Sequence, residues 1–313
     1  MASPPLFTAA IICFNRANMV RDSIESVLRQ EFQDYELVLV DDASTDGSGD
    51  ILREYADRAT VVVRDQNGGE MAARNSAMSA ARGEYVCFLD SDDQWFPWTL
   101  AIYAEAIKRH GRPTIVGAKM FEFRDPAEVN RVVQGPYADS VASCYLTGSH
   151  FRGVVAAVIQ RSAIEDVGRF VDLRYVGPDV DLMLRIGDRP GLVVIESPFT
   201  FAYRHHDSNI MSNFMLRYYG AKQWIESELA GKYPGGLAMR GERLRHITLH
   251  ARAVSVQCLR HWHYRQAFDL YRRTFGWNVE LRRWAYLISF PCMAICPPLT
   301  TVRESLFRRR NRR

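Results

Sequence analysis

The chain lacks the short motifs that mark several common nucleotide-binding and hydrolytic folds. No Gly-x-Gly-x-x-Gly follows the first apolar run, no Gly-x-x-x-x-Gly-Lys-Ser/Thr occurs, and no Gly-x-Ser-x-Gly is present. These absences argue against a dinucleotide-binding Rossmann domain, a P-loop enzyme and an α/β-hydrolase. The six cysteines include no Cys-x-x-Cys pair, which argues against a zinc knuckle or a thiol redox motif.

Targeting and membrane-spanning signals are also scarce. The N-terminal apolar stretch has no basic region before it, so it is interpreted as a strand and not as a signal peptide. The segment 284–302 is apolar but contains Pro291, Pro297 and Pro298. Because a spanning helix needs about 20 apolar residues, an interfacial segment fits this composition better. We therefore expect a cytoplasmic protein with reduced cysteines, peripheral on the inner face of the membrane.

Charge is distributed unevenly along the chain. Residues 1–213 carry 21 Lys and Arg against 30 Asp and Glu, whereas residues 214–313 carry 19 against 6, a net charge of +13. Such a basic end indicates an anionic partner, and no nucleic-acid-binding module is evident, so we expect a membrane and no nucleic acid. The expected docking region begins at residue 279 and includes Trp284, Tyr286, Leu287, Ile288, Phe290 and the five arginines of 308–313. The alternative is that 284–302 packs on the catalytic domain and that the arginines are merely solvated.

The first half of the chain alternates β-rich and helical patterns. Strands are expected at 7–14, 35–40, 60–63 and 85–89. Helices are expected at 17–29, from the turn at 44–47 to residue 55, and at 70–81. This order predicts an α/β fold with a mainly parallel, doubly wound sheet flanked by helices. Further strands are expected at 114–123 and 154–159, part of a helix at 182–186, and helices at 214–229, 240–262, 265–275 and 279–288. We therefore predict an α/β domain at 1–213 and a helical, basic region at 214–313.

Acidic residues collect where two of the predicted strands end. Asp41 and Asp42 follow the second strand, and Asp90, Asp92 and Asp93 follow the fourth. Ligands of open α/β sheets bind beyond the carboxyl ends of the strands. Carboxylates crowded there repel one another unless a cation neutralises them, and a hard divalent cation would bring phosphates with it. The alternative is that these residues are loop residues and helix caps, which is the interpretation preferred for the neighbouring Asp46.

Four sequence blocks over residues 7–98 resemble the nucleotide-binding half of the family 2 inverting glycosyltransferases, which have the glycosyltransferase A fold. The blocks are IICFNR (11–16), LVDDASTDGS (39–48), NGGEMAARN (67–75) and GEYVCFLDSDDQW (83–95). Two later blocks resemble the acceptor-side acidic motif and the closing Arg-x-His loop of the family, GPDVDLMLRIG (177–187) and YRHHDSNIMS (203–212).

The resemblance implies a donor site at the ends of the first strands. Phe14 and Asn15 would line the nucleotide pocket, and Asp42 would accept a hydrogen bond from the base. Arg74 would reach the base or its phosphate, and Asp90 would hold the ribose or the donor sugar. A nucleotide sugar, commonly a UDP-sugar in this family, is therefore the expected donor.

The resemblance also implies a metal and a general base. Asp92 would coordinate Mn²⁺ or Mg²⁺ on the diphosphate, and His206 would complete the metal shell, although the adjacent His205 is an alternative. Asp179 matches the catalytic base. Asp181 stays open as a second candidate, because Pro178 stands where the family usually has an acidic residue.

Other residues have two interpretations each. Arg185 is expected to form a structural ion pair and not to act in catalysis. Trp95 and Trp98 could stack on an acceptor sugar or pack in the core. The family's processive synthases carry a Gln-x-x-Arg-Trp motif, and Arg283-Trp284 lacks its Gln.

The predicted function is a metal-dependent, inverting transfer of a sugar to a hydroxyl of a glycan or lipid-linked acceptor. Two alternatives stay open at this point. One is a nucleotidyltransferase, which would be expected to carry a Gly-rich basic loop after the first strand. The other is a non-catalytic, membrane-associated glycan-binding module on a transferase fold.

Overall fold

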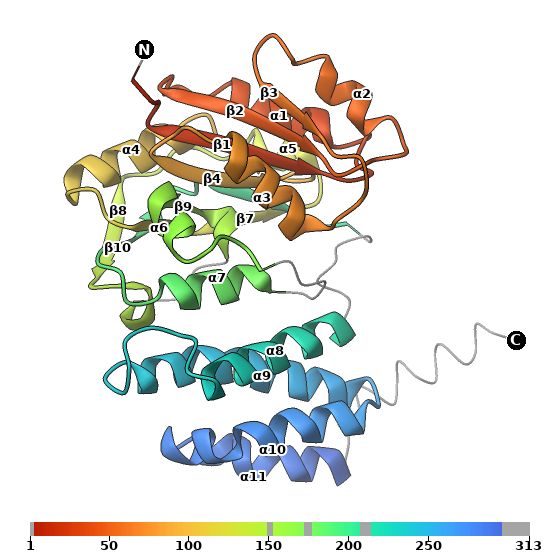
Figure 1. The fold of residues 1–313 in the computed structure, drawn as a ribbon, viewed down its shortest axis with the longest axis vertical. Coiled ribbons are helices and arrows are strands. Elements are labelled where there is room, and N and C mark those ends of the chain that lie inside the picture. Colours follow the sequence, from red (N-terminus) through yellow and green to blue (C-terminus); the bar gives the residue numbers. More distant parts are fainter. Residues whose placement is uncertain (1–2, 149–152, 172–176, 207–213, 296–313) are drawn as a thin grey trace, which may run out of the picture. The chain divides into compact units, whose positions relative to one another are not determined.

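The computed structural model describes residues 3–148, 153–171, 177–206 and 214–295 (Figure 1). The chain divides into two compact units, the first from β1 to β11 and the second from α8 to α11. The predicted arginine-rich tail at 308–313 and the end of the 203–212 block lie outside the described residues.

The first unit is built on an eight-stranded sheet with the order β3-β2-β1-β4-β9-β6-β10-β8. A three-stranded sheet, β5-β11-β7, accompanies it. The elements are β1 (Phe7–Cys13), α1 (Val20–Leu28), β2 (Tyr35–Asp41), α2 (Ser48–Arg53), β3 (Thr60–Val63), α3 (Glu70–Ala80), β4 (Tyr85–Asp90), β5 (Gln94–Trp95), α4 (Thr99–Arg109), β6 (Ile115–Ala118), β7 (Met120–Phe123), α5 (Pro126–Val129), β8 (Ala138–Ala142), β9 (Ala157–Gln160), α6 (Arg161–Asp166), α7 (Pro178–Ile186), β10 (Leu192–Ser197) and β11 (Phe201–Arg204). Short 3₁₀ turns occupy Tyr145–Thr147 and Val154–Ala156.

Strands β3, β2, β1 and β4 are parallel neighbours, so their carboxyl ends meet at one edge of the sheet. The register places Cys13 of β1 opposite Asp41 of β2, and Ile12 opposite Asp90 of β4. The two acidic strand ends therefore flank the end of β1, as the sequence predicts.

Successive side chains of a strand point to opposite faces of the sheet, and each face of this part of the sheet packs against its own layer of helices. Odd-numbered residues such as Ile11, Leu39 and Leu89 share a buried core with residues of α1, α2 and α4. Even-numbered residues face the other way, and there Phe88 packs under Arg74 of α3, 5.3 Å from ring centroid to guanidinium. Helices therefore cover both faces, as expected of a doubly wound sheet.

The second half of the sheet departs from the simple prediction. The strand expected at 114–123 is two strands in different sheets, β6 and β7, which separate at Lys119. The strand expected at 154–159 begins with a 3₁₀ turn, and its β9 portion runs antiparallel to both β4 and β6. Helix α4 and strands β8, β10 and β11 have no counterpart in the prediction.

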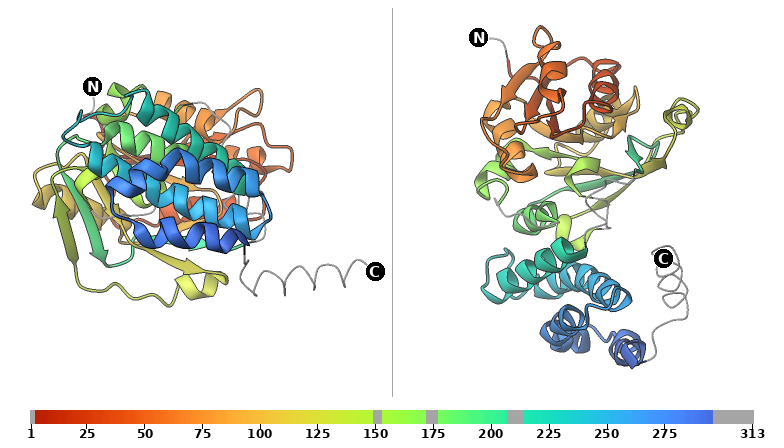
Figure 2. Two further views of the ribbon diagram at one scale, coloured as in Figure 1. Left: turned by 90° about the horizontal axis from the view of Figure 1, so that it is seen from below. Right: turned by 90° about the vertical axis from the view of Figure 1, so that its right-hand side faces the viewer.

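The second unit consists of α8 (Phe214–Leu229), α9 (Arg240–Arg260), α10 (Tyr264–Glu280) and α11 (Trp284–Ile295), which run side by side (Figure 2). The helix expected at 279–288 is wrong, because α10 ends at Glu280 and Arg282 adopts a left-handed φ of 53° before α11 begins. The described part of the chain contains no helix with both the length and the hydropathy required to cross a bilayer.

The apolar residues expected to form one docking surface lie on two different sides of α11, one exposed and one buried. Trp284 and Ile288 are exposed, whereas Tyr286, Leu287 and Phe290 are buried. The hydroxyl groups of Tyr286 and Ser255 of α9 are hydrogen-bonded at 2.8 Å. The expectation that all five face outward is therefore wrong, since helical spacing turns these three residues toward the rest of the unit.

Candidate active site

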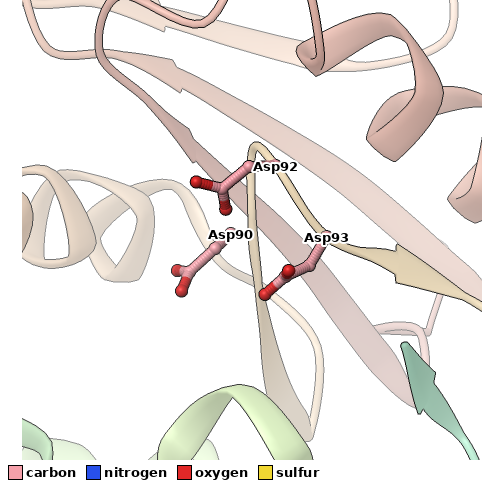
Figure 3. Close-up of side chains that lie close together, drawn as sticks. All are labelled: Asp90, Asp92 and Asp93. Carbon is pink, nitrogen blue, oxygen red and sulfur yellow. The ribbon is translucent and has the colours of Figure 1, made fainter. Parts of the chain in front are cut away.

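Three carboxylates gather immediately after β4 (Figure 3). One oxygen from each of Asp90, Asp92 and Asp93 lies within 4.8 Å of the other two. The turn between β4 and β5 brings them together, and the backbone N–H of Asp93 donates to the carbonyl of Asp90 at 3.1 Å. The cluster lies at the carboxyl edge of the parallel strands, where ligands of such sheets bind.

Asp92 lies between two nitrogen-bearing side chains. Its Oδ2 accepts from Nε of Arg16 at 3.2 Å and lies 2.9 Å from Nε2 of His206. The adjacent His205 instead contacts Oε2 of Glu122 at 2.8 Å. Of the two histidines that the sequence left open, His206 is therefore the one that reaches the acidic cluster.

Asp90 is paired with a buried arginine. Arg74 is 2% exposed, and its NH2 lies 3.2 Å from Oδ1 of Asp90 and 2.6 Å from Oε1 of Glu70. Although 35% of the Asp90 side chain is exposed, many protein atoms surround its carboxylate. This burial, opposed by Arg74 and reinforced by the charges of Glu70 and Asp92, raises the pKa of Asp90 to about 7.

Asp93 has one satisfied and one unsatisfied carboxylate oxygen. Oδ1 accepts from the backbone N–H of Arg204 at 2.8 Å, which ties the cluster to β11. Oδ2 is buried and has no hydrogen-bond partner among the residues that the structure describes. Burial and the neighbouring Asp90 and Asp92 raise the pKa of Asp93 well above its ordinary value.

A divalent cation fits these residues. An oxygen-only set of three carboxylates is the chemistry that Mn²⁺ and Mg²⁺ accept. A cation there would give Oδ2 of Asp93 a partner and would offset the burial and the mutual repulsion that raise the pKa of Asp90 and Asp93. Of the two ligands that the resemblance implies, Asp92 belongs to this set and His206 contacts Asp92 from outside it. Asp93 was expected in the acidic collection, but no role as a metal ligand was assigned to it.

The loop after β1 is held by the loop after β2. Asn15 adopts a left-handed φ of 52°, and its Oδ1 accepts from the backbone N–H of Thr45 at 2.8 Å. Asp46 accepts from the backbone N–H groups of Ala17 and Ser48, so it links this loop to the start of α2. Phe14 is 43% exposed beside the strand end, where an aromatic ring is available to a ligand.

Asp42 is fully engaged within the protein. Its carboxylate accepts from the backbone N–H groups of Gly68 and Gly69 and from Nδ2 of Asn67, and it forms an ion pair with Nε of Arg64 at 2.8 Å. The side chain is 1% exposed and fixes the loop that leads into α3. In this geometry Asp42 shapes the wall of the predicted base pocket; its predicted contact with the base stays a prediction.

The two candidate bases differ in their surroundings. Asp181 is 4% exposed, and its Oδ2 pairs with Nε of Arg185 at 2.8 Å, one turn further along α7. Asp179 is partly exposed in the first turn of α7, and its Oδ2 lies against Gly153, where an added Cβ would come within 2.2 Å. The charge of Asp179 also contributes to raising the pKa of Arg74, against the effect of burial. Of the two carboxylates, Asp179 is therefore the one whose charge reaches Arg74, beside the acidic cluster, and Arg185 forms the ion pair that the sequence predicted.

One site residue carried no clear signal in the sequence. Arg16 is a single arginine after the first strand, and nothing local indicates that it reaches Asp92, 76 positions away. Asp93 was part of the acidic collection that the sequence indicated, but its contact with β11 was not predicted. Trp95 and Trp98, by contrast, are buried, and Nε1 of Trp98 donates to the carbonyl of Phe199, so the packing interpretation holds.

Comparison with known sequences identifies the family. Residues 8–168, just over half of the chain, match the profile of glycosyl transferase family 2. The chain belongs to this family. Among curated relatives, TuaG of Bacillus subtilis strain 168, provisionally named a teichuronic acid biosynthesis glycosyltransferase, is 43% identical over 94 residues, which are 29% of this chain and 37% of TuaG. WcaA of Escherichia coli K12, provisionally named a colanic acid biosynthesis glycosyl transferase, is 36% identical over 108 residues, or 33% and 38% of the two chains. The match thus spans well under half of these relatives.

Solved structures confirm the predicted fold. Residues 1–349 of Staphylococcus aureus TarS, solved with UDP-GlcNAc, align with a TM-score of 0.57 at 18% identity, over 88% of this chain and 91% of that one. The mannosyltransferase PcManGT of Pyrobaculum calidifontis, solved with GDP-Man and Mn²⁺, aligns with a TM-score of 0.53 at 19% identity, over 94% and 88%. Both likenesses support the glycosyltransferase A architecture.

Proposed function

We propose that the chain is an inverting glycosyltransferase that moves a sugar from a nucleotide sugar to a hydroxyl of a glycan or lipid-linked acceptor. The observation that carries this proposal is the three-carboxylate cluster at the ligand edge of the sheet, where Oδ2 of Asp93 is buried and has no partner in the described part of the chain. The donors in the solved relatives, UDP-GlcNAc and GDP-Man, support a nucleotide sugar, with a UDP-sugar the first to test. The names of TuaG and WcaA support a role in the biosynthesis of cell-surface polysaccharide. We propose that the reaction takes place on the cytoplasmic side of the membrane.

The donor would lie across the ends of β2, β1 and β4. Asp90, Asp92, Asp93 and His206 would hold Mn²⁺ or Mg²⁺, as the Mn²⁺ of the solved mannosyltransferase complex suggests. The cation, when bound, would neutralise the negative charge that develops on the nucleoside diphosphate as it leaves. Phe14 would contact the nucleotide with its exposed ring.

Asp179 would activate the acceptor. A carboxylate within hydrogen-bond reach of the acceptor hydroxyl removes its proton as the oxygen attacks the anomeric carbon. Attack on the face opposite the leaving diphosphate inverts the configuration in a single displacement, so one base suffices. The partly exposed Asp179 suits this role, whereas Asp181 is occupied by Arg185.

A donor panel tests the proposal. The melting temperature of the full chain is measured with nucleotide sugars, with and without Mn²⁺, because a ligand that binds the native state raises it. The donor that stabilises the protein is then incubated with acceptor candidates, and the products are identified by chromatography and by the anomeric coupling in proton NMR. Release of a nucleoside diphosphate with an inverted glycoside is expected. Pyrophosphate as the product would support a nucleotidyltransferase, and donor binding without transfer or hydrolysis would support a non-catalytic glycan-binding module.

A further inference from the structure

The last described helix, α11, is apolar on two opposite sides. It carries no charged residue over its 12 positions. Tyr286 and Phe290 point into the helical unit, where Phe290 stacks on Tyr271 with ring centroids 4.5 Å apart. Trp284 and Ile288, one turn apart on the other side, are 53% and 68% exposed. A helix that is hydrophobic all round is normally covered by protein or lipid, so this outer side is suited to an apolar partner.

Helix α10 adds a row of aromatic and basic side chains. Tyr264, Phe268 and Phe275 recur at intervals of four and seven residues, so they lie along one side of the helix, and all three are exposed. Arg265 and Arg272 lie along the same side and form no ion pair with any described residue. Aromatic rings beside arginines are typical of helices that lie at a membrane surface.

The two helices form one continuous surface. The ring of Phe268 on α10 packs edge-to-face with Phe290 on α11 at 5.5 Å. The hydroxyl of Tyr271 donates to the carbonyl of Leu287 at 2.9 Å. The aromatic row of α10 therefore adjoins α11, and the labels in Figure 1 show the two helices next to each other. We call Tyr264, Phe268, Phe275, Trp284 and Ile288, with Arg265 and Arg272, the α10–α11 surface.

Charge around this surface is strongly positive. Residues 214–295 contain 13 Lys and Arg against five Asp and Glu. Each of the five acidic side chains forms an ion pair with an arginine of the same unit: Glu226, Glu228, Glu242, Asp269 and Glu280. The exposed arginines of α10 are therefore not neutralised by these acids and are available to an external anion.

The length of α11 decides how it would meet a bilayer. Twelve residues at about 1.5 Å each give a helix of about 18 Å, well short of the roughly 30 Å of a hydrocarbon core. It would therefore lie along the interface and would not cross it. Apolar side chains would enter the boundary between headgroups and acyl chains while arginines contact lipid phosphates.

We propose that the α10–α11 surface docks the protein on an anionic lipid bilayer. This inference goes beyond the proposed transfer reaction, because it requires neither donor nor acceptor. It also differs from docking by the basic tail alone, since the binding surface is placed on two packed helices. Docking in this way would keep the protein beside lipid-linked molecules in the plane of the membrane.

Vesicle co-sedimentation of the full chain tests the proposal. The vesicles are phosphatidylcholine with and without phosphatidylglycerol, at low and high salt. Trp284→Gln with Ile288→Gln removes the apolar contact of α11, and Arg265→Gln with Arg272→Gln removes two charges from α10. The matched apolar control is Leu229→Gln with Leu237→Gln, because both leucines are exposed in the same unit but outside the α10–α11 surface. The matched charge control is Arg29→Gln with Arg58→Gln in the first unit.

Binding of the wild type to the anionic vesicles is expected, and high salt should weaken it. The variant with both arginines replaced should have a partition coefficient about 30-fold lower than wild type. Each basic residue near an anionic leaflet contributes about a factor of five, and the two factors multiply. The apolar pair should lower it about tenfold or more, with both controls within about twofold of wild type. Circular dichroism and the melting temperature identify any variant that fails to fold, in which case Ile288→Gln alone replaces the pair.

Three results would overturn the proposal. The first is that the wild type does not bind anionic vesicles, and the second is that the variant with Trp284→Gln and Ile288→Gln binds them as tightly as wild type does. The third is that the wild type is a dimer by sedimentation velocity and this variant is a monomer, which would show that a second copy covers this surface.

Discussion

Replacing Asp179 or Asp181 by Asn separates catalysis from stability, because the two carboxylates occupy different environments on the same helix. Asp179 is partly exposed, and we propose that it takes the proton from the acceptor hydroxyl. Asp179→Asn keeps the shape and removes the proton acceptor, so kcat should fall by about 10²–10⁴ while donor affinity is kept. That loss corresponds to about 3–5 kcal/mol of activation free energy.

Asp181→Asn should show the opposite pattern. The Asp181 carboxylate is 6% exposed and pairs with Arg185, whose side chain is 15% exposed. Breaking a buried pair on one side costs about 3–5 kcal/mol, and Asn retains one acceptor oxygen, so a loss of about 2–3 kcal/mol in unfolding free energy is expected. For a unit of this size the melting temperature should fall by about 5–10 °C.

The assay measures steady-state kinetics and thermal unfolding on the same preparations of both variants. Activity is expressed per folded molecule, at a temperature below both transitions. An inactive Asp181→Asn together with an active Asp179→Asn would refute the assignment of the base. Equal losses in both would show that α7 acts as a positioning element and that neither carboxylate takes the proton alone.

Three further predictions concern the metal, the position of the base and the stability of the sheet. Asp92→Ala should abolish the rise in melting temperature that Mn²⁺ and a nucleotide sugar give together, with the free protein still folded; activity that survives both this change and EDTA would contradict the metal site. Gly153→Ala should lower kcat about tenfold or more with little change in donor KM, because the new Cβ would come within 2.2 Å of Oδ2 of Asp179 at a φ of +60°; an unchanged kcat would show that this carboxylate need not stay there. Burial favours a higher pKa for Glu36, but hydrogen bonds from Thr8 and Arg82 outweigh it and lower the pKa below 4.5. The ionised Glu36 therefore stabilises the folded state above pH 4.5, and this stabilisation is lost as the pH falls through the folded-state pKa. Urea unfolding at pH 7 and pH 4 should therefore show a smaller loss of stability for Glu36→Gln than for wild type; equal losses would mean that Glu36 does not contribute to the acid sensitivity.

The sequence was sufficient for the part of the fold that rests on local pattern. The strands from β1 to β4 are near-continuous apolar runs separated by helical periodicity, and such a pattern has few other solutions. The positions of Asp42 and Asp90 at strand ends follow directly from it. The same reasoning brings the acidic strand ends to one edge of the sheet, as the strand register shows, and the donor site at that edge stays a prediction.

The sequence was insufficient where long-range contacts decide the geometry. Strand β9 inserts antiparallel between β4 and β6, although more than 60 residues separate it from β4, and no local pattern specifies that pairing. The end of α10 depends on Arg282 in a left-handed conformation, which is uncommon for a non-glycine residue and has no sequence signature. The contact of Arg16 with Asp92 likewise exists only after β1 and β4 are paired.

The charge balance of the site bears on the order in which its ligands bind. Asp90, Asp92 and Asp93 lie close together; Arg16 contacts Asp92, Arg74 contacts Asp90, and the backbone of Arg204 binds Asp93. Arg74 also pairs with Glu70, so its single charge is shared between two carboxylates. A nucleoside diphosphate would add negative charge beside carboxylates whose pKa values burial and mutual repulsion already raise. We therefore expect the divalent cation to enter before the donor or together with it. Calorimetric titration of the nucleotide sugar with and without Mn²⁺ should show tight binding only in its presence, and donor affinity that is independent of the cation would contradict this order.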